Sequence, residues 1–269
     1  MTAVAAACSN TSEQLPARPV GQTIRVAVVG GMIETGFWQE LALRYQRLTG
    51  NTVELAASGP KPQVIAAFRK GGIDLITVHA SDAMVHLVAE GLAKDPQPWL
   101  LNDLVIMGPV EDPAHIRGER DAAKAVQMIM ASNSKLIIHA SLGADGVLHD
   151  LKDAAKLTLD PALMVMFDGA NQHRILERAA ELKAYTMVGR IPVITGKLTA
   201  HGMEIMVRGD PRLRRPYLVE VAANAGPAAI DLAAFLRQPD TQAWIASYGR
   251  GKYDDHPLFF PIAASSETR

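Results

Sequence analysis

Short apolar runs rich in β-branched residues alternate with segments of helical spacing along this chain, and that alternation restricts its fold more than any other feature. The first run, residues 24–29, is uninterrupted and ends at Gly30 and Gly31, which is typical of a buried parallel strand. Residues 35–48 then place apolar side chains at helical spacing and stop before Gly50. Strands and helices in repeated succession, joined by short loops, predict an α/β protein with doubly wound sheets.

The same reasoning predicts the remaining elements of the chain. Further strands are expected over residues 52–56, 73–78, 104–107, 135–139, 184–188, 204–207 and 218–222. Further helices are expected over residues 63–69, 82–90, 122–131, 145–155, 172–182, 192–198, 227–236 and 238–246. Segments around 102–106 and 216–221 flank a self-contained middle, so two chain crossings between two lobes would form a hinge. A single doubly wound domain fits the same pattern.

Composition excludes several classes of function. A formal net charge of -1 argues against an electrostatic nucleic-acid binder, and no apolar run approaches the roughly 18 to 20 residues that span a bilayer. The histidines are scattered singly and the chain has one cysteine, so we expect no metal site and no internal disulfide. Glu34 stands where a dinucleotide fingerprint needs its third glycine, and motifs for a nucleophile or a P-loop are missing. We therefore expect no cofactor and no catalytic residues.

The N-terminal segment has two interpretations. Small residues precede Cys8, which resembles the cleavage box of a bacterial lipoprotein signal, although the basic start and the long apolar stretch are missing. A flexible start with an incidental cysteine fits equally well. Residues 9–22 are rich in polar residues, proline and glycine, so residues 1–22 are expected to be a signal remnant or a disordered tether. Residues 263–269 are expected to be a flexible tail.

Five stretches resemble the tungstate-binding proteins of ABC importers, in the same order and at similar spacing. They are GGIDLITVH at 71–79, NDLVIMGPVEDP at 102–113, AYTMVGR at 184–190, GDPRLRRPY at 209–217 and HPLFFP at 256–261. The resemblance covers roughly residues 24–262 and implies the two-lobed fold of periplasmic binding proteins, with each lobe a doubly wound sheet. It implies two crossing hinge strands, with lobe one over 23–105 and 208–262 and lobe two over 106–207.

The resemblance also implies a function. Such a protein captures a small anionic or polar ligand in the cleft between its lobes, closes around it and docks on the membrane permease of an ABC importer. It implies a monomer that is periplasmic or lipid-anchored, that binds no nucleic acid and that is not an enzyme. The alternative from another class is a small-molecule enzyme on the same scaffold, and a ligand-sensing domain of a regulator is a third.

The expected ligand pocket departs from the family pattern. Residues 28–31 carry no hydroxyl where the family has a Thr/Ser run, and Lys61 stands in a loop where the family has a threonine. His139 stands at the position of the family's anion-binding arginine, and residues 171–174 replace a glycine-rich helix start. These departures favour an organic carboxylate or a related polar molecule, with a tungstate or molybdate oxyanion as the alternative.

Candidate site residues are placed by the rule that ligands of open α/β sheets bind beyond the carboxyl ends of the strands. Backbone N–H groups at helix starts favour anions, a lysine supplies a point charge, and an arginine can hold a carboxylate through two nitrogens. Structural alternatives are a tight turn for Gly30 and Gly31, a helix cap for Asn171, an ion pair for Arg190, and core packing for Trp38. The candidate ligand-binding set is Gly30, Gly31, Met32, Ser58, Lys61, His79, His139, Ser141, Asn171, Gln172 and Arg174, with Tyr185, Thr186 and Arg190 added by the resemblance.

Overall fold

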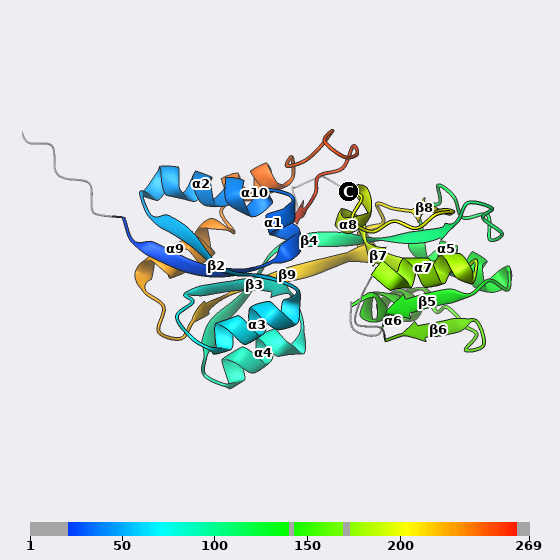
Figure 1. The fold of residues 1–269 in the computed structure, drawn as a ribbon, viewed down its shortest axis with the longest axis horizontal. Coiled ribbons are helices and arrows are strands. Elements are labelled where there is room, and N and C mark those ends of the chain that lie inside the picture. Colours follow the sequence, from blue (N-terminus) through cyan, green and yellow to red (C-terminus); the bar gives the residue numbers. More distant parts are fainter. Residues whose placement is uncertain (1–20, 140–142, 169–172, 263–269) are drawn as a thin grey trace, which may run out of the picture.

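The computed structural model describes residues 21–139, 143–168 and 173–262, which form two lobes joined by extended strands (Figure 1). Lobe one contains the strands β1 (Thr23–Val29), β2 (Thr52–Gly59), β3 (Leu75–His79), β9 (Arg214–Ala222) and β10 (Phe260–Pro261). Its helices are α1 (Gly30–Glu34), α2 (Phe37–Thr49), α3 (Lys61–Arg69), α4 (Asp82–Ala89), α9 (Pro227–Phe235) and α10 (Pro239–Ile245). Strand β1 pairs in parallel with β2 and β3, while β9 is antiparallel to β3. Helices α2 and α10 lie on one face of this sheet and α3 and α4 on the other (Figure 1).

Lobe two is built around a second sheet. Its strands are β5 (Leu136–His139), β6 (Met164–Phe167), β7 (Tyr185–Gly189) and β8 (Met203–Val207). Its helices are α5 (Ala122–Ala131), α6 (Ala144–Ala155), α7 (His173–Glu181) and α8 (Arg190–Ile194). Strand β5 pairs in parallel with both β6 and β7. Like the first lobe, it therefore combines a parallel core with antiparallel neighbours.

The long strand β4 (Ala93–Pro109) belongs to both sheets. It pairs antiparallel with β9 as far as Asp103, and from Leu104 onward it pairs with β7. Because successive side chains of a strand point to opposite faces, Leu104 and Ile106 enter one core of lobe two while Val105 and Met107 enter the other. The chain returns to lobe one through the 3-10 helix η1 (Pro211–Leu213), so two crossings join the lobes.

A buried arginine braces the point where β4 changes sheets. The guanidinium of Arg190 is 1% exposed and its Nε donates to both carboxylate oxygens of Asp103, at 2.8 and 2.9 Å. Its Nη1 donates to Asp254 at 3.0 and 3.1 Å, and its Nη2 donates to the carbonyl oxygens of Pro257 and Leu258. Arg190 thus ties lobe two's β7–α8 turn to the crossing strand and to the C-terminal segment.

The α/β two-lobed fold predicted from the sequence is confirmed, with differences in individual elements. Strand β4 begins at Ala93, although the sequence predicted a strand only from residue 104, because prolines and the left-handed Asp95 (φ 54°) interrupt its apolar pattern. The helix expected over 35–48 is α2, and the short helix α1 precedes it. Strand β6 was not predicted, since its residues are half-buried or exposed.

The core packing bears on the predicted lobe boundaries and on Trp38. Leu213, predicted to belong to lobe one, packs in a core of lobe two, and Ile191, predicted to belong to lobe two, packs in the core of lobe one. The boundaries at 105/106 and 207/208 stay predictions. Trp38 is 3% exposed and meets Trp99 edge-on at 6.2 Å, so it belongs to the core of lobe one. Across the described residues, no helix combines the length and apolarity needed to cross a membrane.

Candidate functional site

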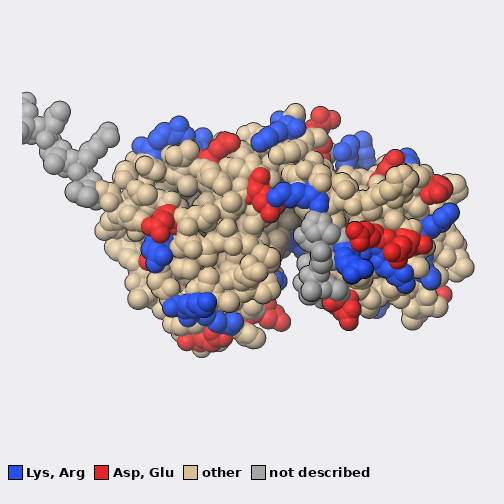
Figure 2. All heavy atoms as spheres, viewed as in Figure 1, with Lys and Arg blue, Asp and Glu red and all other residues tan. Residues whose placement is uncertain are grey.

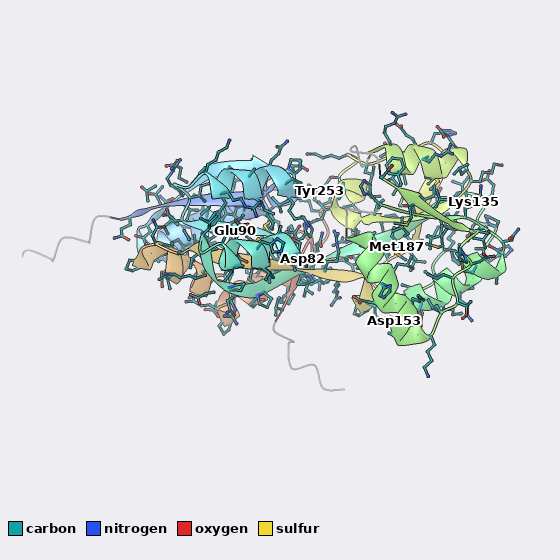
Figure 3. The ribbon with its side chains drawn as sticks, turned by 90° about the horizontal axis from the view of Figure 1, so that it is seen from below. Asp82, Glu90, Lys135, Asp153, Met187 and Tyr253 are labelled. Atoms are coloured by element: carbon teal, nitrogen blue, oxygen red, sulfur yellow. The ribbon has the colours of Figure 1, made fainter. Side chains whose placement is uncertain are left out.

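Three strands of lobe one end together at the side that faces lobe two. Val29 pairs with Gly59, and Val28 pairs with Thr77, so Gly30 lies level with His79. The carboxyl ends of β1, β2 and β3 therefore form one edge, where the sequence placed its first group of candidate residues. In Figure 3, Asp82 at the start of α4 lies on the side of lobe one nearer to lobe two, and Glu90 after its end lies farther from lobe two.

Lys61 supplies positive charge at this edge. It is the first residue of the nine-residue helix α3 and its side chain is half-buried, close to the end of β2. Burial and then the charge of Arg215 lower the pKa of Lys61, while Asp82 acts in the opposite direction. Within the part of the chain that the structure describes, Lys61 forms no salt bridge. An ammonium group and the free N–H groups of a helix start thus lie at the same place.

The crossing strands add a second cation. In the β4–β9 ladder Asn102 lies opposite Arg215, and in the β3–β9 ladder His79 lies opposite Tyr217. Residues opposite one another, or two apart along a strand, share a face of the sheet, so these four side chains form one group. Arg215 Nη2 is 3.4 Å from His79 Nε2. Burial lowers the pKa of Arg215, yet a guanidinium stays protonated in proteins.

Lobe two meets this group at the start of helix α6. Gly143 precedes the twelve-residue helix with φ +72°, and a Cβ atom added there would lie 3.0 Å from Arg215 Nη1. A glycine is therefore needed for the left-handed backbone and for the approach of the guanidinium. Helix starts carry a partial positive charge, so Arg215 faces a pole of its own sign. This arrangement of two cations and two helix starts is electrostatically suited to an anion.

The structure brings some of the other candidates to this region. Gly30 and Gly31 begin α1, half-buried, at the end of β1, and Ser58 is exposed near the end of β2. His139 ends β5, is 3% exposed and contacts Phe167 at 5.6 Å between ring centroids. Ser141, Asn171 and Gln172 lie outside the described residues. Arg174 is exposed on α7.

Four candidates have their side chains engaged elsewhere. Met32 is fully buried in the core of lobe one. Thr186 Oγ1 donates to the carbonyl of Ile137 at 2.8 Å, inside the sheet of lobe two. Tyr185 begins β7, so it lies at the opposite end of the sheet from His139, and its hydroxyl donates to Asp112 at 2.8 Å.

Arg190 is the fourth of these candidates. It forms ion pairs with the buried Asp103 and Asp254, so it takes the structural role that was the alternative to ligand binding.

Sequence reasoning missed Arg215 and Asn102. Both lie in stretches used for the resemblance, but neither was singled out as a ligand-facing residue. A usable signal was present, because consecutive arginines precede Pro216 in a segment that continues as an apolar strand. Among the described residues, no cluster of three or more histidine, cysteine, aspartate or glutamate side chains could hold a metal ion.

The chain is similar to known solute-binding proteins along most of its length. The family model for bacterial extracellular solute-binding proteins matches residues 24–250. The tungstate-binding protein TupA of Peptoclostridium acidaminophilum is 27% identical in an alignment 255 residues long, which covers 90% of this chain and 86% of that protein. The solved structure of a tungstate-binding protein TupA from Desulfovibrio alaskensis G20 has a TM-score of 0.67 at 25% identity, covering 90% of this chain and 100% of that one.

A solved structure described as the tungstate ABC transporter from Geobacter sulfurreducens shares the fold. It has a TM-score of 0.65 at 21% identity and covers 84% of this chain and 98% of that chain. The resemblance drawn from the five sequence stretches is confirmed.

Proposed function

The chain belongs to the family of bacterial extracellular solute-binding proteins, and from that premise we propose that it captures a small anion between its two lobes. The observation that carries the proposal is the meeting of Lys61 and Arg215 with the starts of α3 and α6. Like charges brought together with partial burial raise the free energy of the ligand-free protein. An anion between the lobes would remove that cost and gain charge-assisted hydrogen bonds.

Binding would draw the lobes together. We propose lobe one as residues 23–105 and 208–262 and lobe two as 106–207, bending where β4 leaves β9 at Asp103 and meets β7 at Leu104. Lys61 and Arg215 come from lobe one and α6 from lobe two, so a ligand that contacts all three favours the closed form. The names of the similar proteins support a role beside an ABC importer, in which the closed form docks on the membrane permease.

Membership of the extracellular solute-binding family supports a proposal about the protein's location and partners. The protein would be extracytoplasmic and monomeric, either periplasmic or tethered by lipid at Cys8. On the face seen in Figure 2 the basic and acidic side chains are intermixed over both lobes, and the formal net charge is -1, which supports a partner other than nucleic acid. The named relatives are transport binding proteins, and we propose no covalent chemistry. Turnover of a co-purified ligand in a conversion assay would contradict that.

Two ligand classes compete for this site. A small organic carboxylate fits the fork of Arg215, which can donate two parallel hydrogen bonds, and fits strand ends that carry no hydroxyl at residues 28–31. A tungstate or molybdate oxyanion is favoured by the likeness to the tungstate-binding structure, at a TM-score of 0.67. We propose the carboxylate as the ligand class and the oxyanion as the alternative.

A thermal-unfolding screen tests the proposal and separates the two classes. The purified protein is heated with tungstate, molybdate, sulfate, phosphate or a panel of small mono- and dicarboxylates. A ligand at a hundredfold excess over its Kd stabilises the folded state by about 2.7 kcal/mol. A shift with a carboxylate alone supports the first class, and a shift with tungstate or molybdate alone supports the second. If no anion shifts the midpoint, or if Lys61→Ala and Arg215→Ala both bind as the wild type does, the proposed pocket is wrong.

A further inference from the structure

The imidazole of His79 packs on its face against its neighbour across the sheet. It lies 4.1 Å from the ring of Tyr217 between centroids, with 34° between the ring planes. The two residues are directly opposite in the β3–β9 ladder, and Tyr217 is 2% exposed. A ring packed on its face against a buried tyrosine has little freedom to turn. The plane of the His79 ring is therefore fixed by the sheet.

The Nε2 atom of that ring lies beside a guanidinium. His79 Nε2 is 3.4 Å from Arg215 Nη2, and an arginine nitrogen always carries hydrogens. Burial, then the charges of Arg215 and Lys61, hold the pKa of His79 well below its ordinary range, while the Asn102 side chain acts in the opposite direction. The ring is therefore neutral near pH 7, with one nitrogen protonated. A favourable contact with Arg215 requires the lone pair on Nε2 and the hydrogen on Nδ1.

The other end of the same guanidinium lies against lobe two. Arg215 Nη1 lies 3.0 Å from the position a Cβ atom of Gly143 would take, at the first turn of α6. One nitrogen thus meets His79 within lobe one while another reaches the second lobe. A long flexible side chain gains binding strength when it is fixed beforehand, because less conformational entropy is lost with the ligand.

We infer that His79 is a positioning residue, which accepts a hydrogen bond from Arg215 and so holds its guanidinium toward α6 for the incoming anion. The effect on affinity rests on the proposed function, but the geometry does not. If His79 contacted the ligand directly as a donor, its hydrogen would lie on Nε2 instead. The two roles therefore differ in a property of the ligand-free protein.

Nitrogen NMR of the ligand-free protein at pH 7.5 measures that property. The expected result is a neutral His79 with its hydrogen on Nδ1, and a shift toward the Nε2–H form in Arg215→Lys. The exposed His86 in α4 is the internal control, and its tautomer should not respond to Arg215→Lys. A wild-type His79 with its hydrogen on Nε2 would overturn the inference, whether or not any anion binds.

Affinity measurements test the consequence with a double-mutant cycle, using tungstate and malonate as probes. Because His79→Leu removes a hydrogen bond to the charged Arg215, we expect this variant to bind the probes about tenfold more weakly. His79→Gln restores an acceptor near the same place and should stay within about threefold of the wild type. In the Arg215→Lys background, His79→Leu should have little further effect, because its role passes through the guanidinium.

Two results of the cycle would overturn the inference. Equal losses from His79→Leu in both backgrounds would mean that His79 binds the ligand itself. Equal losses from His79→Gln and His79→Leu would mean that only the ring's packing matters. If neither probe nor any other anion binds the wild type, the proposed function fails, and the tautomer of His79 still decides the positioning role.

Discussion

Glu220 offers a sharp test of the energetics of lobe one. It lies in β9 opposite Ile76, it is fully buried, and neither carboxylate oxygen meets a hydrogen-bond partner among the described residues. Burial raises the pKa of Glu220 from 4.5 to about 7. At 1.36 kcal/mol per pH unit, ionised Glu220 costs the folded state roughly 3 kcal/mol. Because the folded protein binds more protons than the unfolded chain between these values, this carboxyl lowers stability as the pH rises from 4.5 to 7.

Replacing Glu220 with glutamine removes that charge while nearly keeping the side chain's shape. We expect Glu220→Gln to raise the free energy of unfolding by roughly 3 kcal/mol at pH 8 and by less than about 1 kcal/mol at pH 5. Urea unfolding at pH 5, 6, 7 and 8, followed by far-UV circular dichroism, measures the difference. The exposed Glu177 in α7 provides the control, because Glu177→Gln should leave the pH profile unchanged. Parallel profiles for the wild type and Glu220→Gln would refute the reasoning.

Two further comparisons use matched positions. Gly143→Ala must accept φ +72° beside Arg215, so we expect a loss of about 1 kcal/mol or more, whereas Gly146→Ala inside α6 meets nothing within 4 Å and should gain up to about 1 kcal/mol. Urea midpoints that move alike would contradict this. Arg190→Met leaves the buried carboxylates of Asp103 and Asp254 without their counter-ion, so it should lower the free energy of unfolding by roughly 3–5 kcal/mol. Arg178→Met removes an exposed ion pair with Glu181 and should lower it by less than about 0.5 kcal/mol. Similar losses of unfolding free energy in both would be the contrary result.

The periodic elements of the fold were predictable because burial imposes the pattern that the sequence displays. The helix predicted over 122–131 begins and ends where α5 does, since Asp121 accepts from the N–H of Lys124 and one face is apolar. The first half of β4 was not predictable in this way. Its pairing with β9 is fixed by the partner strand and tolerates two register shifts around proline-containing segments, so no alternation remains in its own sequence.

The site was predictable in outline and not in its particular contacts. Lys61 and His79 follow from strand ends, a rule that needs only the order of elements. Arg190 could not be distinguished from a ligand-binding arginine, because Asp103 and Asp254 are 87 and 64 residues away in sequence. Arg215 meets both His79 and the start of α6 only because β9 lies beside β4 at the crossing, and that adjacency is a property of the folded chain.

Isothermal titration of the anion that gives the largest thermal shift tests the central claim most directly, with two variants of one helix. Lys61 begins α3 beside the end of β2, while Lys70 follows the last residue of the same helix and is exposed. If an anion is held between the lobes by Lys61, Lys61→Met should weaken binding at least about tenfold, because a half-buried charge partner is lost. Lys70→Met should bind as the wild type does. Equal affinities for the wild type and both variants would contradict the proposed site.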